Sequence, residues 1–318
     1  MKPCLACLKP LPSGDSRYHT DCLKRFWGKD TPQHELDFSR HDIHDLAARH
    51  IQKRLSITGV QPKISMGFSK TVRNKRLTII GALEGGYILK PPFPDFPLLP
   101  EIEHVSMLMT QAAGIPTVPF LLIPLNDGTL AYLTKRIDRD DHGGKISMED
   151  ACQFTGKLTQ HKYLGSYEQI SKSIQLYCNN QLFDVLRFYH QLIICFLIGN
   201  NDAHLKNFSI IHTNDMFQLS PAYDMVATTI LIPEDRDELA LNLNGKKRKL
   251  TRDDFTKALN TSQLSSVAQK NLWLRVQKGV QSWENIIKAS LLDPSTKELL
   301  KTTIRERADE LSICDVRV

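Results

Sequence analysis

The sequence predicts an α+β protein of two lobes, with a β-rich first lobe over residues 1–140 and a mostly helical second lobe over 141–318. Residues 55–90 contain β-branched runs broken by glycine and proline, as in a sheet. After residue 141, long segments place apolar residues at helical spacing. At 318 residues the chain is longer than most single domains. The change of character falls near 137–145, where we expect a hinge.

The first lobe is expected to open with a helix at about 37–54, after a segment rich in cysteine. Strands follow in LSITGVQPKISMGF, RLTIIGAL and GYILKPP. A helix over 101–113 should end at Gly114, because Pro116 cannot continue it. Next, Asp127-Gly128 predicts the turn of a hairpin between PFLLIPL and AYLTKRID.

The second lobe is expected to contain helices over 147–155, 168–178 and 182–197. A loop-and-strand region over 200–245 interrupts them, and the last 65 residues are again helical.

Composition excludes several classes of protein. Apolar residues at 41% and charged residues at 24% exclude a disordered, collagen-like or coiled-coil chain. The net charge of +6 is modest, and no run approaches the ~18 apolar residues of a membrane span. The start MKPCLACLKP lacks the apolar core of a signal peptide, and seven cysteines are too few for a disulfide framework. We therefore expect a cytoplasmic protein without a membrane partner.

The segment GNNDAHLKNFS carries the strongest chemical signal. Asp202 and Asn207 are five residues apart, as are the base and the metal-binding amide of a kinase catalytic loop. One carboxylate accepts the proton of an incoming hydroxyl, while an oxygen ligand holds Mg²⁺ against the phosphates. Asp224, in SPAYDMV, is a candidate second metal ligand. The alternative is that Asn-Asn-Asp simply forms a turn.

The first lobe contains candidates for phosphate binding. Lys90 ends the apolar strand GYILK, and Glu103 begins the next helix, the order in which kinases pair a lysine with a glutamate. Alternatively, Lys90 is a solvated strand residue and Glu103 a carboxylate that favours a helix N-terminus. The loop SITGVQPK, residues 56–63, has one glycine and could cover phosphates or be a plain turn.

These motifs together resemble the HipA family of bacterial serine/threonine kinases. The matching segments are SITGVQPKIS, YILKPP, IEHVSMLMTQAAGI, YLTKRIDR, MEDACQ, GNNDAHLKNFS and SPAYDMV. The chain lacks the extra N-terminal subdomain of long members, and so is most similar to the short HipT toxin kinases of three-part HipBST toxin–antitoxin systems. The resemblance implies a kinase-like fold and phosphorylation of a protein hydroxyl with ATP and Mg²⁺.

The resemblance also implies partners and a target. The partners are a small DNA-binding HipB-like antitoxin and a HipS-like small protein, with DNA reached only through the antitoxin. The target is an aminoacyl-tRNA synthetase, whose phosphorylation would inhibit translation.

Residue roles follow from the resemblance. Asp202 takes the catalytic position, and Asn207 and Asp224 take the metal ligands. Autophosphorylation falls on Ser56 or Thr58, which would put negative charge where ATP phosphates bind. The ATP-binding set comprises Ser56, Thr58, Gly59, Lys63, Lys90, Glu103, Lys135, Ile137, His204 and Lys206. Lys135 departs from the long members, which carry glutamate there, so the adenine contact is assigned to backbone near 135–137.

Two further clusters allow a second interpretation. Cys4, Cys7, His19 and Cys22 have the residue types of a structural zinc site, although three buried free thiols would fit as well. The basic run 245–252 is either a solvated hairpin tip or a contact for an acidic target or DNA. The remaining cysteines Cys152, Cys178 and Cys195 are expected in the core, and His161, His190 and His212, which have no spaced partners, are interpreted as structural.

Two other functions compete with the protein kinase. A small-molecule phosphotransferase of the aminoglycoside type also uses D-x-H-x-x-N, but its expected substrate pocket is acidic, whereas the C-terminal segment here is mixed to basic. The other is a non-catalytic pseudokinase or DNA-bound co-repressor. The presence of Lys90, Asp202, Asn207 and Asp224 together disfavours it, because a protein without kinase activity does not need all four.

Overall fold

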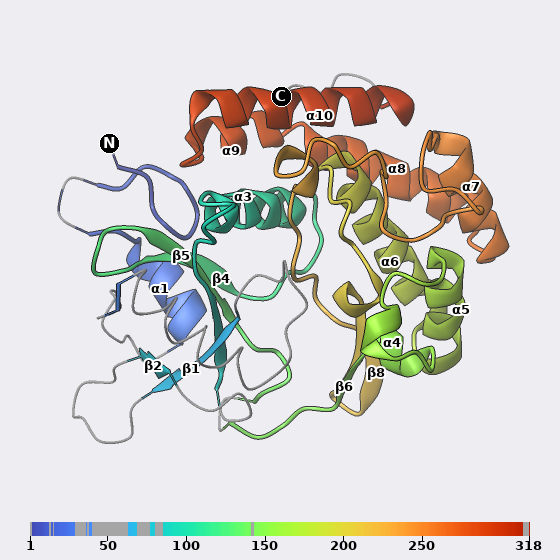
Figure 1. Cartoon of the computed structure of the whole chain (residues 1–318). Coiled ribbons are helices and arrows are strands. Elements are labelled where there is room, and N and C mark those ends of the chain that lie inside the picture. Colours follow the sequence, from blue (N-terminus) through green and yellow to red (C-terminus); the bar gives the residue numbers. More distant parts are fainter. Residues whose placement is uncertain are drawn as a thin grey trace. The chain divides into compact units, whose positions relative to one another are not determined.

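The computed structural model describes residues 2–12, 14, 16–28, 36, 38–39, 63–68, 77–79, 85–140, 143–313 and 318 (Figure 1). The chain divides into two compact units. The first contains Met1–His104, Val118–Gly144 and Ala289–Leu291, and the second contains Val105–Thr117, Lys145–Lys288 and Leu292–Val318. This division assigns residues 105–117, predicted in the first lobe, to the second unit. The helix predicted at about 37–54 falls almost wholly outside the described residues.

An antiparallel five-stranded sheet with the order β2-β1-β3-β5-β4 forms the first unit. Its strands are β1 (Ile64–Phe68), β2 (Leu77–Ile79), β3 (Tyr87–Lys90), β4 (Phe120–Pro124) and β5 (Leu130–Lys135). The predicted hairpin is β4–β5. Gly128 supplies a φ of +83° in its turn, and Asp127 Oδ1 accepts a hydrogen bond from the backbone N–H of Thr129 at 3.0 Å.

Aromatic side chains attach helix α1 (Thr20–Trp27) to this sheet. The ring of Trp27 lies 5.0 Å from that of Tyr87 on β3 and 5.8 Å from that of Phe68 on β1. Such ring pairs add about 0.5–1.5 kcal/mol beyond the area they bury. Helix α1 is therefore held on the sheet by its last turn.

Helix α3 (Leu99–Ala112) matches the helix predicted over 101–113 and extends from the first unit into the second. It ends where Gly114 takes a φ of +84°, as the glycine predicted.

The second unit is built around α6 (Gln181–Leu197), as predicted over 182–197. Its residues from Phe188 to Leu197 are all buried, as expected for a helix that is apolar on every side. Phe188 contacts Phe208 with ring centroids 5.1 Å apart, and Tyr167 contacts Phe208 at 6.1 Å. These contacts connect α5 (Tyr167–Tyr177), α6 and the segment after the candidate catalytic loop.

The helix predicted over 147–155 is partly wrong. Met148–Asp150 form strand β6, and only Ala151–Phe154 form a helix, α4. The strand forms because Met148 and Asp150 pair with Ile211 and Ser209 of β7, which is far along the chain. Strands β7 (Ser209–Thr213) and β8 (Met216–Leu219) complete a sheet of order β6-β7-β8.

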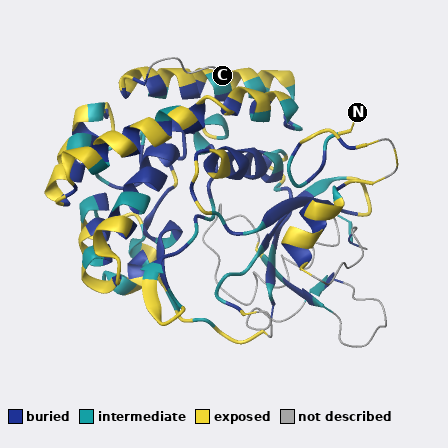
Figure 2. Ribbon diagram, turned by 180° about the vertical axis from the view of Figure 1, so that it is seen from behind, coloured by how far each residue is buried: buried dark blue, intermediate teal, exposed yellow. Residues whose placement is uncertain are grey.

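The C-terminal part of the second unit is helical, as predicted. Its helices are α7 (Arg252–Thr261), α8 (Ser266–Val280), α9 (Trp283–Ala289) and α10 (Pro294–Glu310). Figure 2 shows buried and exposed stripes along the helix beside the C-terminus. A Cβ on Gly279 would lie 2.5 Å from Ala113 Cα, so α8 needs glycine where it meets the end of α3. The Trp283 indole N–H donates to the Met109 carbonyl at 2.9 Å.

The basic run 245–252 lies at a turn in which Lys246, Lys247 and Arg248 are paired with acids. Lys246 Nζ lies 3.0 Å from Asp254 Oδ1, and Arg248 Nε lies 2.7 Å from Asp237 Oδ1. This pairing favours the predicted hairpin tip over a contact surface for nucleic acid.

Among the described residues, no helix is both long and apolar enough to cross a membrane.

Candidate active site

A buried ion pair joins β3 to α3 in the first unit, as the sequence predicted. Lys90 Nζ lies 2.5 Å from Glu103 Oε1, and the side chains are only 4% and 0% exposed. The lysine ammonium also lies 5.5 Å from the centre of the Tyr132 ring on the neighbouring strand β5. A buried charge pair of this kind costs desolvation free energy, so it is poor evidence for stability and better evidence for a positioned cation.

The candidate catalytic loop in the second unit begins at Gly199, two residues after the end of α6, and Gly199 has a φ of +73°. The Thr229 backbone N–H donates to the Gly199 carbonyl at 3.0 Å, and the Thr229 hydroxyl donates to it at 2.8 Å. The backbone N–H of Asn201 donates to the Thr228 hydroxyl oxygen at 2.7 Å. Two threonines from η3 (Thr228–Ile230) therefore fix the start of the loop.

Asn207 and Asp224, the predicted metal ligands, meet in the second unit. The amide Nδ2 of Asn207 donates to Asp224 Oδ2 at 3.2 Å, and Asn207 Oδ1 accepts from the His204 backbone N–H at 2.9 Å. Asp224 has a φ of +58°, a left-handed conformation that is uncommon outside glycine but tolerated by aspartate. Such a conformation persists only where the surroundings enforce it, and it often marks a functional position.

Asp202, the predicted catalytic residue, is exposed, whereas its neighbours Asn201 and Ala203 are buried. Its backbone N–H donates to Asn200 Oδ1 at 3.3 Å, and the Ala203 carbonyl accepts from the Tyr167 hydroxyl at 2.9 Å. The loop thus presents one carboxylate to solvent from a fixed backbone.

Tyr163 contacts this carboxylate and was missed from the sequence. Its hydroxyl donates to Asp202 Oδ1 at 2.5 Å, and its ring lies 5.1 Å from the His204 ring. Burial and the bond to Asp202 raise the pKa of Tyr163, so it is the protonated donor at neutral pH. Nothing in the stretch around residue 163 distinguishes this tyrosine from a surface aromatic.

His204 and Lys206, both predicted to contact ATP, are engaged within the second unit. Burial lowers the pKa of His204, although the Asp202 carboxylate opposes this effect. Lys206 forms an ion pair with Asp150, the residue that caps the N-terminus of α4. The Lys206 carbonyl accepts from the Tyr223 hydroxyl at 2.9 Å.

The chain matches the family model described as HipA-like C-terminal domain over residues 55–289. The chain belongs to this family. It is 29% identical to a Haemophilus influenzae protein named "Putative kinase", a match covering 72% of this chain and 69% of the relative. It is 32% identical to "Putative kinase Y4dM" of Sinorhizobium fredii, a match that covers 69% of this chain and 56% of the relative. The chain thus spans little more than half of the second relative.

Two solved structures share the fold of this HipA-like chain. One is the complex of HipA, HipB and operator DNA from a Shewanella oneidensis toxin–antitoxin system, with a TM-score of 0.67, 20% identity, and coverage of 83% of this chain and 68% of that one. The other is the Helicobacter pylori proinflammatory kinase CtkA, with a TM-score of 0.52, 14% identity, and coverage of 78% and 93%. These likenesses confirm the predicted mixed fold.

The other predicted nucleotide-binding residues of this HipA-like chain have mixed outcomes. Ser56, Thr58 and Gly59 lie outside the described residues, and Lys63 is exposed just before β1. Lys135 and Ile137 lie at and just after the end of β5. The Lys135 and Arg136 backbone N–H groups already donate to the carbonyls of Pro119 and Gly86 at 2.9 and 2.8 Å.

Proposed function

We propose that this HipA-like chain transfers the γ-phosphoryl group of ATP to a serine or threonine hydroxyl of a protein. One observation carries the proposal: an exposed carboxylate, Asp202, stands five residues before Asn207, whose side chain bonds to Asp224. A hydroxyl nucleophile needs a base open to solvent, and the phosphates need oxygen ligands for their metal ion close by.

The residues present fit a magnesium ion. Asn207 offers an amide oxygen and Asp224 a carboxylate, the hard oxygen ligands that Mg²⁺ prefers. Their side chains meet through the Asn207 NH2 group, and Asn207 Oδ1, which accepts one hydrogen bond from the His204 N–H, has a second lone pair for the ion. Both residues would hold the ion. When bound, it would neutralise negative charge on the phosphates of ATP.

The proposed ATP-binding residues are assigned from the motif resemblance and from the contacts that each makes within its own unit. The Lys90 ammonium, held by Glu103, is suited to the α- and β-phosphates, as in kinases. The backbone N–H groups of Lys135 and Arg136 already donate within the sheet. We therefore assign binding of the adenine edge to the backbone of Ile137 and to neighbouring carbonyl groups. His204 and Lys206, and the loop residues Ser56, Thr58, Gly59 and Lys63, complete the proposed set.

Phosphoryl transfer then needs little covalent chemistry from the protein. The substrate hydroxyl oxygen attacks the γ-phosphorus, the bond to the bridging oxygen breaks, and ADP leaves. Asp202 accepts the hydroxyl proton. The Tyr163 hydroxyl must first give up its place on Asp202 Oδ1, since it occupies an oxygen that the incoming hydroxyl would use.

The biological role proposed here is a toxin of the short HipT type. The fold likeness to a HipA seen in complex with HipB and DNA supports a HipB-like antitoxin as partner. A HipS-like protein as second partner, and an aminoacyl-tRNA synthetase as target, rest on the motif resemblance.

Mass spectrometry of the intact protein after incubation with Mg-ATP tests the activity. We expect added phosphate on the wild type and its loss in Asp202→Asn, since a general base contributes about 10²–10⁴-fold to rate. Asp215→Asn serves as control because it removes an exposed carboxylate from the β7–β8 turn. Equal phosphorylation of wild type and Asp202→Asn would disprove the mechanism, and transfer to an aminoglycoside alone would favour the small-molecule enzyme.

The autophosphorylation site is tested separately. We propose that phosphate falls on Ser56 or Thr58, so Ser56→Ala combined with Thr58→Ala should remove it. Because the same loop is proposed to bind ATP, ATP binding of the double variant is measured beside it, which separates loss of the acceptor hydroxyls from loss of the nucleotide. Peptide mapping of the wild type distinguishes the two hydroxyls. Unchanged phosphorylation of the double variant would show that the regulatory site lies elsewhere.

A further inference from the structure

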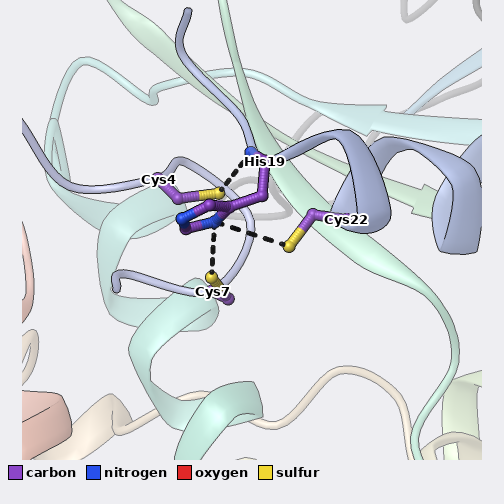
Figure 3. A group of neighbouring side chains, drawn as sticks. All are labelled: Cys4, Cys7, His19 and Cys22. Carbon is purple, nitrogen blue, oxygen red and sulfur yellow. Dashed lines mark hydrogen bonds between the residues drawn. The ribbon is translucent and has the colours of Figure 1, made fainter. Parts of the chain in front are cut away.

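The N-terminal segment brings three thiols and an imidazole to one point, outside the candidate active site. One ligand atom from each of Cys4, Cys7, His19 and Cys22 lies within 4.8 Å of all the others (Figure 3). His19 Nδ1 lies 3.4 Å from Cys7 Sγ and 4.0 Å from Cys22 Sγ. With Zn–S bonds of about 2.3 Å and Zn–N bonds of about 2.0 Å, a tetrahedral site of three sulfurs and one nitrogen has ligand separations of about 3.5–3.8 Å.

Two local backbone structures present these ligands. Cys4 and Cys7 flank a tight turn in which the Leu8 N–H donates to the Cys4 carbonyl at 2.9 Å, with Leu8 at a φ of +60°. His19 is the N-cap of α1 and Cys22 lies in its first turn. The His19 backbone N–H donates to Cys4 Sγ at 3.4 Å, which joins the two structures.

The groups that hydrogen-bond to the four candidate ligands are those expected around a bound metal. His19 Nε2 lies 3.1 Å from the Pro10 carbonyl oxygen. A carbonyl accepts only, so Nε2 carries the proton and Nδ1 turns its lone pair toward the sulfurs. Metal-bound histidines almost always donate their second N–H in this way. Arg25 Nη2 also donates to Cys22 Sγ at 3.3 Å, which offsets the net negative charge of three thiolates on a divalent ion.

We propose that Cys4, Cys7, His19 and Cys22 form a closed structural zinc site. Sulfur-rich tetrahedral sets select zinc, and four protein ligands leave no position open for catalysis. A cluster of free thiols, the alternative from the sequence, could also donate to His19 Nδ1 and accept from Arg25, so the metal content of the protein separates the two.

The site has a structural task within the first unit. Leu5 and Ala6 lie between the first two ligands. The Leu5 carbonyl accepts from the Leu122 N–H on β4 at 2.9 Å, and the Ala6 carbonyl lies 3.2 Å from His104 Nε2 on α3. His104 follows Glu103 directly. Zinc would therefore secure the segment against β4 and the first turns of the helix that carries the partner of Lys90.

Metal analysis of the full-length protein, purified without added metal, tests the proposal. We expect one equivalent of zinc, released when a mercurial reagent blocks the thiols. Replacement by Co²⁺ should give the thiolate charge-transfer and d–d absorption of a tetrahedral site. Wild-type protein with no bound zinc and no uptake of Co²⁺, or with disulfides among these cysteines, would overturn the proposal.

Variants separate binding from folding. Cys7→Ser should lose zinc, whereas Cys178→Ser removes a buried thiol outside the cluster and should keep it. Cys7→Ser binding as much zinc as wild type would contradict the site. If Cys7→Ser fails to fold, hydrogen exchange of chelator-treated wild type decides. After metal removal, peptides with Ala6 and Leu122 should exchange faster than in the metal-bound protein, whereas peptides of α8 should exchange at the same rate. Equal rates for the Ala6 and Leu122 peptides before and after metal removal would also overturn the proposal.

Discussion

Gly199 and Gly245 have almost the same left-handed backbone, with φ of +73° and +74°, but different surroundings. A Cβ on Gly199 would lie 2.7 Å from Thr229 Oγ1 and 2.9 Å from Thr303 Cγ2, whereas a Cβ on Gly245 meets no atom within 4 Å. Gly245→Ala should cost about 1–2 kcal/mol from backbone strain alone. Gly199→Ala should cost about 1–3 kcal/mol more from crowding.

Denaturant unfolding of both variants measures this difference. Because the backbone strain is shared, the excess for Gly199→Ala reports the steric contact at the start of the candidate catalytic loop. Equal losses in the two variants would mean that Thr229 of η3 and Thr303 of α10 both move away from the new methyl group freely.

Tyr163→Phe removes the hydroxyl that donates to Asp202. If phosphoryl transfer proceeds as proposed, the substrate hydroxyl no longer competes for that oxygen. We then expect KM for the protein substrate to fall by about tenfold, which corresponds to the lower end, about 1.5 kcal/mol, of what a hydrogen bond to a charged group contributes. Steady-state kinetics measure it. Tyr177→Phe, on an exposed tyrosine at the end of α5, should have no effect. A lower kcat in Tyr163→Phe would instead show that Tyr163 positions the carboxylate.

At the scale of elements, the Lys90–Glu103 pair connects a strand to a helix through buried charge. Lys90→Met should cost about 3–5 kcal/mol, because it leaves the Glu103 carboxylate buried beside an apolar side chain. The double variant Lys90→Met with Glu103→Leu should recover most of that loss and still fail to bind ATP.

Thermal or denaturant unfolding, together with nucleotide binding, checks this pair. The pair Lys301–Glu298 on α10, in which Lys301 is partly buried and Glu298 exposed, is the control, and Lys301→Met should cost less than about 1 kcal/mol. A double variant that is no more stable than Lys90→Met would mean that the pair contributes to packing beyond its charges.

The elements that the sequence predicted well are those defined by neighbours in the chain. The β4–β5 hairpin follows from Asp127-Gly128, and α5 and α6 follow from apolar spacing. Strand β6 was missed because its partner β7 lies some sixty residues later, and three residues have no periodicity of their own. Tyr163 was missed for the same reason: its role comes from a contact 39 residues away.

The contacts of the candidate site also divide into those that the order of motifs predicted and those that only the fold determines. The pairing of Lys90 with Glu103, and that of Asn207 with Asp224, followed from motif order and is now seen as contacts. The engagement of Lys206 by Asp150 had no sequence signal, because lysine motifs do not specify which carboxylate is near in the fold.

At the scale of the whole molecule, acid should destabilise the protein below neutral pH. Burial lowers the pKa of His104 and of His190 to about 4, and the Arg275 charge adds to the shift of His190. Both are near 6.5 in an unfolded chain. Between about pH 6.5 and 4 the unfolded state binds more protons, so stability falls as pH falls, by up to about 1.4 kcal/mol per pH unit for each histidine.

Glu101 opposes this trend, since burial raises its pKa to about 7 and the folded state then holds its proton. The expected net effect is still a loss of stability from pH 7 to 5.5. Unfolding of variants over that range checks the assignment. His190→Gln should flatten the dependence and Glu101→Gln should steepen it, and a stability independent of pH in all three proteins would contradict it.

The Tyr18 hydroxyl donates to the Leu122 carbonyl at 2.7 Å, across 104 residues of chain. At about 5–20 residues per second, the ribosome needs on the order of 5–20 s to make strand β4 after it has made Tyr18. For that interval the nascent N-terminal segment has no sheet to join. The turn after Cys4 and the first turn of α1 are local, so both can form while the rest of the chain is still being synthesised. Because a single helical turn is unstable by itself, zinc bound as proposed is what would keep this segment shaped until strand β4 emerges.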